Sequence, residues 1–215
     1  MLPIFNIFEL GVKEGEKNSY VAVGKNNITK SVLNDEGTLG MYLVQEKENP
    51  NMTYMFEVYE DEKSYQKHIK SEQYKEFLRQ SPTILTNHKK KIQVMPEYMG
   101  DKKFVQTRNT RVNYVTVDVK ERFNDTFREI VLNEMKQSIK KEEGVYVIYA
   151  ATAIGNPNKW YFFEIYENEK AYQKHRKTAH FKKYIEQTEN IIENKEFINI
   201  EGIKLLNKGN LNYVK

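Results

Sequence analysis

The sequence predicts an α+β fold in which the element order βαββαβ occurs twice. The first observation behind this prediction is an internal repeat, because residues 54–70 and 161–177 share 12 of 17 residues at a constant offset of 107. The same offset pairs Asn49-Pro50-Asn51 with Asn156-Pro157-Asn158. The second observation is that strand-like alternation and helix-like spacing of apolar residues take turns along each copy. The chain therefore contains two copies of one unit of roughly 100 residues.

The second copy shows the predicted elements most clearly. Residues 111–120 alternate β-branched side chains as a strand does, and a hairpin is expected across the Asn-Pro-Asn turn. Both hairpin strands are apolar on both faces, so we expect this sheet to be covered twice. The order is that of a ferredoxin-like split βαβ unit. The further predicted elements are a helix from Asp125 or Thr126 to Gly144, hairpin strands at 145–154 and 159–167, a short helix at 171–176, a second helix capped by Thr178, and a last strand at 197–205.

The apolar periodicity lapses between the two copies, where Gly100-Asp101 offers a turn. In the first copy the opening helix must pass through Gly24 and Asn27, which are weak helix formers, so we interpret this copy as the more scaffold-like. The predicted organisation is a first ferredoxin-like domain at 1–98, a linker at 99–110 and a second ferredoxin-like domain at 111–215.

Composition excludes several classes of chemistry. The 215 residues are 39% hydrophobic and 30% charged, with a net charge of +4 and no cysteine. The lack of cysteine excludes disulfides, thiolate metal sites and a cysteine nucleophile. The charges are interspersed and no apolar stretch reaches ~18 residues, so we expect a soluble cytoplasmic protein with no nucleic-acid partner and no membrane partner. Homo-oligomerisation is left open by the sequence.

A series of motifs resembles the antibiotic biosynthesis monooxygenase (ABM) family over nearly the full length of both copies. The second copy is the closer match, because the first has Gln73 and Tyr74 where the second has His180 and Phe181. The matching positions in the second copy are Val119-Lys120-Glu121, Glu142-Glu143-Gly144, Tyr149, Asn156-Pro157, Phe162, Glu164, Tyr166, Ala171, His175, Thr178 and His180-Phe181.

The resemblance implies a fold, a reaction type and partners. It implies a tandem member whose two domains pack sheet to sheet as an intrachain dimeric α+β barrel, and a monooxygenase that uses a small-molecule substrate and dioxygen without a cofactor. The haem-degrading branch of the family needs an axial histidine, and the corresponding positions here are Leu78 and Ile185. We therefore expect the purified protein to carry no metal, flavin or haem.

His175 is the predicted catalytic base, because a neutral imidazole accepts a proton near cytoplasmic pH. Asn113 and Tyr166 are predicted to orient the substrate anion, and Trp160 to cover its ring. The alternative is that the histidines staple a helix junction and that Glu57 and Glu164 are satisfied buried carboxylates that lock the fold. The predicted substrate-binding residues are Trp160, His180, Glu164, Tyr149, His68, Tyr59 and Asn6.

Two classes of function remain open from the sequence. The first is a cofactor-independent monooxygenase acting on a small aromatic, quinol or enol substrate. The second is a non-catalytic tandem barrel that binds a small hydrophobic ligand. An RNA recognition motif shares the βαββαβ order, but Trp160 and Phe162 fill its small positions and Glu164 would repel phosphate.

Overall fold

The computed structural model describes residues 2–215 and divides them into two compact units. Unit 1 comprises the chain up to Val94 together with Phe104–Gln106 and Ile200–Gly209. Unit 2 comprises Met95–Lys103, Thr107–Asn199 and Asn210–Lys215. Among the described residues, no helix is long and apolar enough to cross a membrane.

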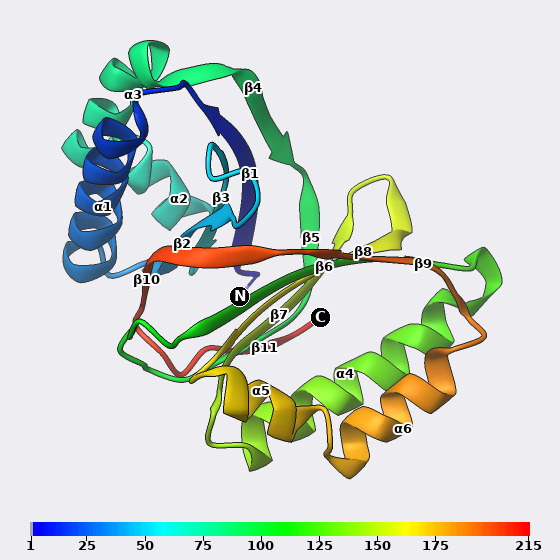
Figure 1. The fold of residues 1–215 in the computed structure, drawn as a ribbon. Coiled ribbons are helices and arrows are strands. Elements are labelled where there is room, and N and C mark those ends of the chain that lie inside the picture. The colour runs from blue at the N-terminus through cyan, green and yellow to red at the C-terminus, as the bar shows by residue number, and fades with distance from the viewer. Residues whose placement is uncertain (1) are drawn as a thin grey trace. The chain divides into compact units, whose positions relative to one another are not determined.

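Unit 1 is a five-stranded antiparallel sheet in the order β10-β2-β3-β1-β4. Helices α1 and α3 lie side by side next to this sheet, as Figure 1 shows in blue and green. The elements are β1 (Ile4–Val12), α1 (Lys17–Asn34), β2 (Thr38–Glu46), β3 (Met52–Tyr59), α2 (Glu62–His68), α3 (Glu72–Ile84), β4 (Leu85–Ile92) and β10 (Ile200–Asn207).

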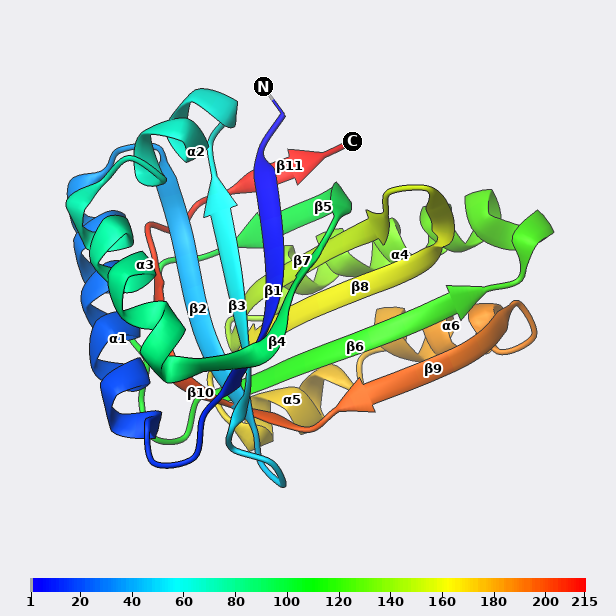
Figure 2. The same cartoon turned by 90° about the horizontal axis from the view of Figure 1, so that it is seen from above.

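Unit 2 is a six-stranded sheet in the order β11-β5-β7-β8-β6-β9. Helices α4 and α6 run alongside each other next to the sheet (Figure 2). The elements are β5 (Val94–Asp101), β6 (Arg111–Val119), a 3-10 turn η1 (Glu121–Phe123), α4 (Asn124–Lys141), β7 (Val145–Ala153), β8 (Asn156–Tyr166), α5 (Glu169–His175), α6 (Ala179–Thr188), β9 (Ile192–Ile198) and β11 (Asn212–Val214).

The predicted fold class is confirmed, since each unit has the ferredoxin-like βαββαβ order. Its four core strands are β2-β3-β1-β4 in unit 1 and β7-β8-β6-β9 in unit 2. Each sheet also takes one strand from the other copy, because β5 pairs within unit 2 and β10 within unit 1. The described strands thus form two separate sheets and not one closed barrel. The packing of the sheets face to face stays a prediction.

Two predicted boundaries differ from the structure. The expected last strand at 197–205 is two strands, because the chain leaves β9 at Ile198 and enters the other sheet as β10 at Ile200. The expected linker at 99–110 begins inside β5, whose residues from Pro96 to Asp101 are all buried. Continuous domains at 1–98 and 111–215 therefore do not describe the compact units, which are discontinuous in sequence.

Strand β5 escapes a pattern-based prediction because it buries two acidic residues. Glu97 accepts hydrogen bonds from Thr152 Oγ1 at 2.9 Å and Lys215 Nζ at 3.1 Å, and it also pairs with Arg128. Asp101 accepts from the Leu211 backbone N–H at 3.0 Å. Such partners offset the cost of burying a carboxylate, but they lie far away in the sequence.

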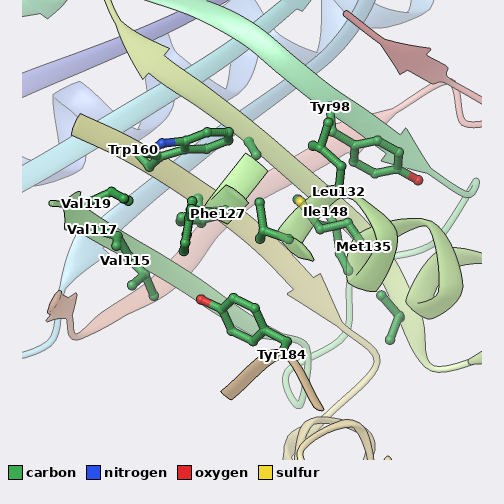
Figure 3. Packing of buried hydrophobic residues seen from close by; sticks show 14 of the residues in the cluster. Tyr98, Val115, Val117, Val119, Phe127, Leu132, Met135, Ile148, Trp160 and Tyr184 are labelled. Carbon is green, nitrogen blue, oxygen red and sulfur yellow. The ribbon is translucent and has the colours of Figure 1, made fainter. Parts of the chain in front are cut away.

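Aromatic side chains fill the core of unit 2 between the sheet and its helices, as Figure 3 shows. The Phe127 ring of α4 packs edge-on against Trp160 with centroids 5.2 Å apart, and against Tyr184 of α6 at 6.3 Å. Trp160 is fully buried, and its Nε1–H donates to Asn124 Oδ1 at 2.9 Å. This packing fixes α4 and α6 on the sheet, and both helices contribute to the site described below.

Helix boundaries follow the sequence in part. Thr178 caps α6 as predicted, since its side chain accepts a hydrogen bond from the Phe181 backbone N–H at 3.3 Å. Helix α1 runs unbroken over 18 residues despite its weak helix formers. Helix α4 starts at Asn124 without a side-chain cap and ends at Lys141, before Gly144.

Gly144 serves a close approach between a turn and helix α5. Its carbonyl accepts a hydrogen bond from the Glu167 backbone N–H at 2.9 Å. A Cβ at this position would lie 2.7 Å from the Cβ of Ala171. The lack of space for a side chain therefore favours glycine here. Backbone conformation is not the reason, since Gly144 does not have a positive φ.

We expect Gly144→Ala to lower the free energy of unfolding by about 1–3 kcal/mol, because the added methyl group overpacks the contact with Ala171. Urea denaturation measures this change. The double variant Gly144→Ala/Ala171→Gly removes the clash and should regain part of the loss. If the double variant is as unstable as the two single changes combined, the close contact is not the cause.

Candidate functional site

A cavity of about 60 Å³ lies within unit 2. It is enclosed by the sheet strands β6, β8 and β9 and by helices α4, α5 and α6. Its wall on β9 is the most open, since Phe197 is 43% exposed. The lining residues are Asn113, Val115, Val117, Val131, Glu134, Met135, Phe162, Glu164, Tyr172, His175, Phe181, Tyr184, Lys195 and Phe197.

Three predicted residues form a hydrogen-bonded group on neighbouring strands. Asn113 on β6 lies opposite Glu164 on β8, and its Nδ2 donates to Glu164 Oε2 at 3.3 Å. The Tyr166 hydroxyl donates to the same oxygen at 2.8 Å. Asn113 and Glu164 line the cavity, whereas Tyr166 is fully buried and supports the carboxylate from the side. Burial, followed by the negative charge of Glu164, raises the pKa of Tyr166 well above its ordinary value.

His175 lies at the end of α5, where Glu142 contacts one of its ring nitrogens. Nδ1 of His175 is 3.0 Å from Glu142 Oε1, and Nε2 of His180 is 2.6 Å from the same oxygen. The side chains of all three residues are nine-tenths or more buried. Burial, the largest single effect, acts to lower the pKa of His175, but the hydrogen bond to Glu142 and the surrounding carboxylates outweigh it and raise this pKa.

Glu134 approaches His175 from helix α4. Its Oε1 lies 3.8 Å from Nε2 of His175 and accepts a hydrogen bond from Ser138 Oγ at 2.6 Å. Burial raises the pKa of Glu134 to about 7, against the opposing effects of His175 and Ser138. The imidazole of His175 thus stands between two carboxylates, with Nε2 towards Glu134 and the cavity that both residues line.

The corresponding positions of unit 1 form a less charged network. Asn27 stands where unit 2 has Glu134, Asp35 where it has Glu142, and Gln73 where it has His180. His68 Nδ1 lies 3.2 Å from Ser31 Oγ, and its buried Nε2 has no hydrogen-bond partner. Burial lowers the pKa of His68 to about 4, against a smaller opposing effect of Asp35. The two equivalent histidines therefore differ strongly in proton affinity.

The structure brings some predicted site residues together and separates others. Asn113, Glu164, Tyr166, His175 and His180 gather at or beside the cavity. Asn6, Tyr59 and His68 belong to unit 1. There, Asn6 Nδ2 donates a hydrogen bond to Glu57 Oε2 at 3.5 Å, and the Tyr59 hydroxyl donates to the same oxygen at 2.9 Å. This repeats the group of unit 2, as expected for a structural hydrogen bond present in both copies.

Two predicted ligand contacts are not at the cavity. Trp160 packs in the core, nearly parallel to Phe162 at 5.9 Å, so it does not cover a ligand ring. Tyr149 is fully buried, and its hydroxyl donates to Asp101 on β5. Both are aromatic residues within apolar strands, and this pattern does not distinguish a core face from a cavity face.

Two glutamates that surround His175 are not among the predicted site residues. Glu134 has the pattern of a surface residue on a charged helix, and Glu142 stands in a family motif that assigns it no role. The repeat contains the missing signal, because Glu134, Glu142 and His180 all differ from their counterparts in the first copy while His175 does not. A set of positions that changes together around a shared histidine indicates a site in one copy only.

The fold places the chain among tandem proteins built from two ferredoxin-like repeats, and its second repeat carries a helix-covered cavity. The model of the antibiotic biosynthesis monooxygenase (ABM) family matches residues 3–80 and 110–187. These matches cover more than half of the chain, which therefore belongs to the ABM family and carries its domain twice. The comparison with curated proteins gave no match.

Solved structures share the tandem arrangement. A candidate monooxygenase of Lactobacillus acidophilus NCFM is 29% identical with a TM-score of 0.94, over 99% of this chain and 100% of that one. A candidate monooxygenase of Fusobacterium nucleatum is 30% identical with a TM-score of 0.93, over 100% of this chain and 98% of that one. An anthrone oxidase-like protein, 9% identical with a TM-score of 0.56 over 96% of this chain and 94% of that one, shares the fold alone.

We expect Glu142→Gln to lower the pKa of His175. The substitution removes the carboxylate charge and the strong acceptor for Nδ1–H, both of which favour the protonated ring. NMR titration of the imidazole resonances measures the shift, with the exposed His88 as an internal control. An unchanged titration of His175 would show that Glu142 does not control its protonation.

His68 should make the protein less stable in mild acid. The unfolded chain binds a proton at His68 below about pH 6.5, whereas the folded chain does so only near pH 4. The unfolded state thus binds more protons between these values, so stability falls as pH falls. Between pH 7 and pH 5, urea denaturation should show the wild type losing about 2 kcal/mol more than His68→Gln. Parallel pH profiles would contradict this.

Proposed function

We propose that the chain is a cofactor-independent monooxygenase whose reaction takes place in the cavity of unit 2, with a small aromatic, quinol or enol as substrate and dioxygen as the second reactant. Membership of the ABM family and the two similar candidate monooxygenases support this reaction type. The observation that carries the proposal is the environment of His175, which lines the cavity with Nδ1 held by a buried carboxylate.

This environment suits His175 to act as a general base. With Nδ1–H donated to Glu142, the lone pair of Nε2 is directed away from that carboxylate and accepts a proton from a phenol or enol. The negative charge of Glu142 stabilises the imidazolium that forms, as in other carboxylate–histidine pairs. Asn113, whose amide lies at the cavity wall, is placed to donate a hydrogen bond to the substrate oxygen.

The substrate anion then reduces dioxygen directly. The proton moves to Nε2 of His175 and the electron pair of the broken O–H bond stays on the substrate, from which oxygen takes electrons. Where the keto form of an enol carries two hydrogens on the reacting carbon, one oxygen atom ends as a carbonyl and the other as water, and all four electrons come from that carbon. A quinol instead ends as a hydroxyquinone and water, with two electrons from the quinol-to-quinone oxidation and two from the ring C–H that becomes C–OH. Neither balance needs a further reductant.

The size of the cavity limits what enters it. A volume of about 60 Å³ accommodates dioxygen or a few waters, but it is smaller than the roughly 150 Å³ cavity that holds a benzene ring. We infer that a substrate inserts its reacting edge and leaves the rest of its ring system at the open wall. Lys195 and Phe197 on β9 form that wall, and both are exposed.

The alternative proposal is a non-catalytic module that binds a small hydrophobic ligand. It is favoured by the Asn–Glu–Tyr group, which is the same in both units and therefore serves the fold. The two proposals differ in one measurable respect, since a binding module should bind quinols without consuming oxygen.

Oxygen uptake with a panel of quinols and polyphenols tests the proposal. We expect His175→Gln to lower the rate by 10²- to 10⁴-fold, the usual cost of losing a positioned base. Glutamine is preferred to alanine because His175 is buried, with its ring 4.7 Å from Phe181 and 5.3 Å from Tyr166, and truncation would leave a hole.

His68→Gln is the matched control, because it makes the same change at the equivalent position of unit 1. It should leave oxygen uptake within about twofold of wild type, far less than the effect of losing a base. Equal losses of rate in the two variants, or no uptake by the wild type with any quinol that it binds, would favour the binding module.

A further inference from the structure

We propose that Glu134, His175 and His180 form a binding site for one divalent transition-metal ion in unit 2. One ligand atom from each of these residues lies within 4.8 Å of those from the other two. The residues come from three different helices, α4, α5 and α6, so their convergence is a property of the tertiary fold. This proposal departs from the expectation of no bound metal, which rests on the lack of thiolates and of a phosphate-binding loop and on Leu78 and Ile185 at the axial haem positions.

One separation between the ligand atoms is close to that of a metal site, and the other two are within 4.8 Å. Four ligands at about 2.0–2.2 Å from a tetrahedral zinc ion are about 3.4 Å from one another. Glu134 Oε1 and His175 Nε2 are 3.8 Å apart, so a small movement of either side chain reaches this spacing.

Glu142 supplies the outer support that metal-binding histidines usually have. A ligating imidazole commonly donates its other N–H to a carboxylate, which fixes the ring and its tautomer. Nδ1 of His175 lies 3.0 Å from Glu142 Oε1, which leaves Nε2 towards Glu134. His180 Nε2 contacts the same oxygen at 2.6 Å, so a bound ion draws this nitrogen away from Glu142 or takes Glu142 as a further ligand.

The donor set selects the class of ion. Two imidazole nitrogens and a carboxylate suit Zn²⁺, Fe²⁺, Co²⁺ and Ni²⁺, whereas Ca²⁺ and Mg²⁺ prefer oxygen ligands alone. Glu134 and His175 also line the cavity, so a small molecule there can reach the remaining coordination positions. The site thus resembles an open metal site more than a closed structural one.

Unit 1 lacks this donor set at the equivalent positions. It keeps His68 but has Asn27 for Glu134 and Gln73 for His180. Asparagine and glutamine amides are weak ligands for these ions, and one imidazole with one distant carboxylate does not make a site. The proposal therefore predicts one ion per chain.

This inference goes beyond the proposed function and competes with it at one atom. An ion bound to His175 Nε2 occupies the lone pair that the oxygenase mechanism uses, so an ion at this site should inhibit oxygen uptake. That consequence rests on the proposed function, whereas metal binding itself does not. Binding is therefore measured without substrate, and the two proposals can fail separately.

Isothermal titration of the full chain with Zn²⁺, after removal of metal with a chelator, tests the site. We expect one ion per chain in the wild type and at least about 100-fold weaker binding in His180→Gln and Glu134→Gln, which place an amide where a ligand stood. His180→Gln introduces the residue that the first copy carries at this position, so it should fold. Co²⁺ provides a second readout through its visible d–d bands.

His88→Gln is the control, because His88 is exposed and pairs with Glu9 in unit 1. It should bind Zn²⁺ as the wild type does. The proposal is overturned if the wild type binds no Zn²⁺, if binding is lost in His88→Gln, or if both site variants bind with wild-type affinity while circular dichroism shows them folded.

Discussion

The carboxylate of Glu142 fixes three helices of unit 2 at once. It follows directly after α4, and its Oε1 contacts His175 at the end of α5 and His180 at the start of α6. A buried carboxylate without such partners would be costly, so these two contacts offset the cost of burying Glu142. The junction adjoins the cavity through His175, which lines it.

The same junction in unit 1 shows what the fold requires and what it does not. Gln73 donates to Ser31 Oγ at 3.1 Å and to Asp35 Oδ2 at 3.2 Å, and Asp35 also pairs with Lys67. Hydrogen bonds among an amide, a hydroxyl and one carboxylate are thus enough to join the helices. Unit 1 thus forms this junction without a second histidine or a counterpart of Glu134, so these two residues of unit 2 are the positions where function is to be sought.

The internal repeat makes the fold predictable from the sequence, because each element is predicted independently in two copies. Strands β5 and β10, which pair in the sheet of the other copy, are not predictable in the same way. Pro96 and Gly100 break the alternation in β5, and its buried Glu97 is acceptable only because Arg128 and Lys215 reach it from distant parts of the chain. A local sequence pattern indicates local propensity, whereas the burial of an acidic residue depends on hydrogen-bond and ion-pair partners that are distant in the sequence.

A site residue is predictable from the sequence only where its type is unusual for its position in the predicted helix or strand. His175 and Glu164 stand out, one as a histidine in a repeated motif and the other as an acid in an apolar strand. Glu134 does not stand out, because a glutamate on a helix is exposed in most sequences. Its burial follows from the packing of α4 against the sheet, which the 3.6-residue period indicates only approximately.

The position of His175 between two carboxylates limits what this site is able to do. A base and a metal ligand both need the lone pair of Nε2, so a protein with one such imidazole cannot use both at the same time. Glu142 serves either role equally, because it orients the ring through Nδ1 in both. Glu134 also favours both roles, since its carboxylate, 3.8 Å from Nε2, attracts a proton on Nε2 and a metal ion alike. If both proposals hold, a proton and a metal ion compete for Nε2 of His175 at equilibrium, so pH and the free metal concentration together set its state.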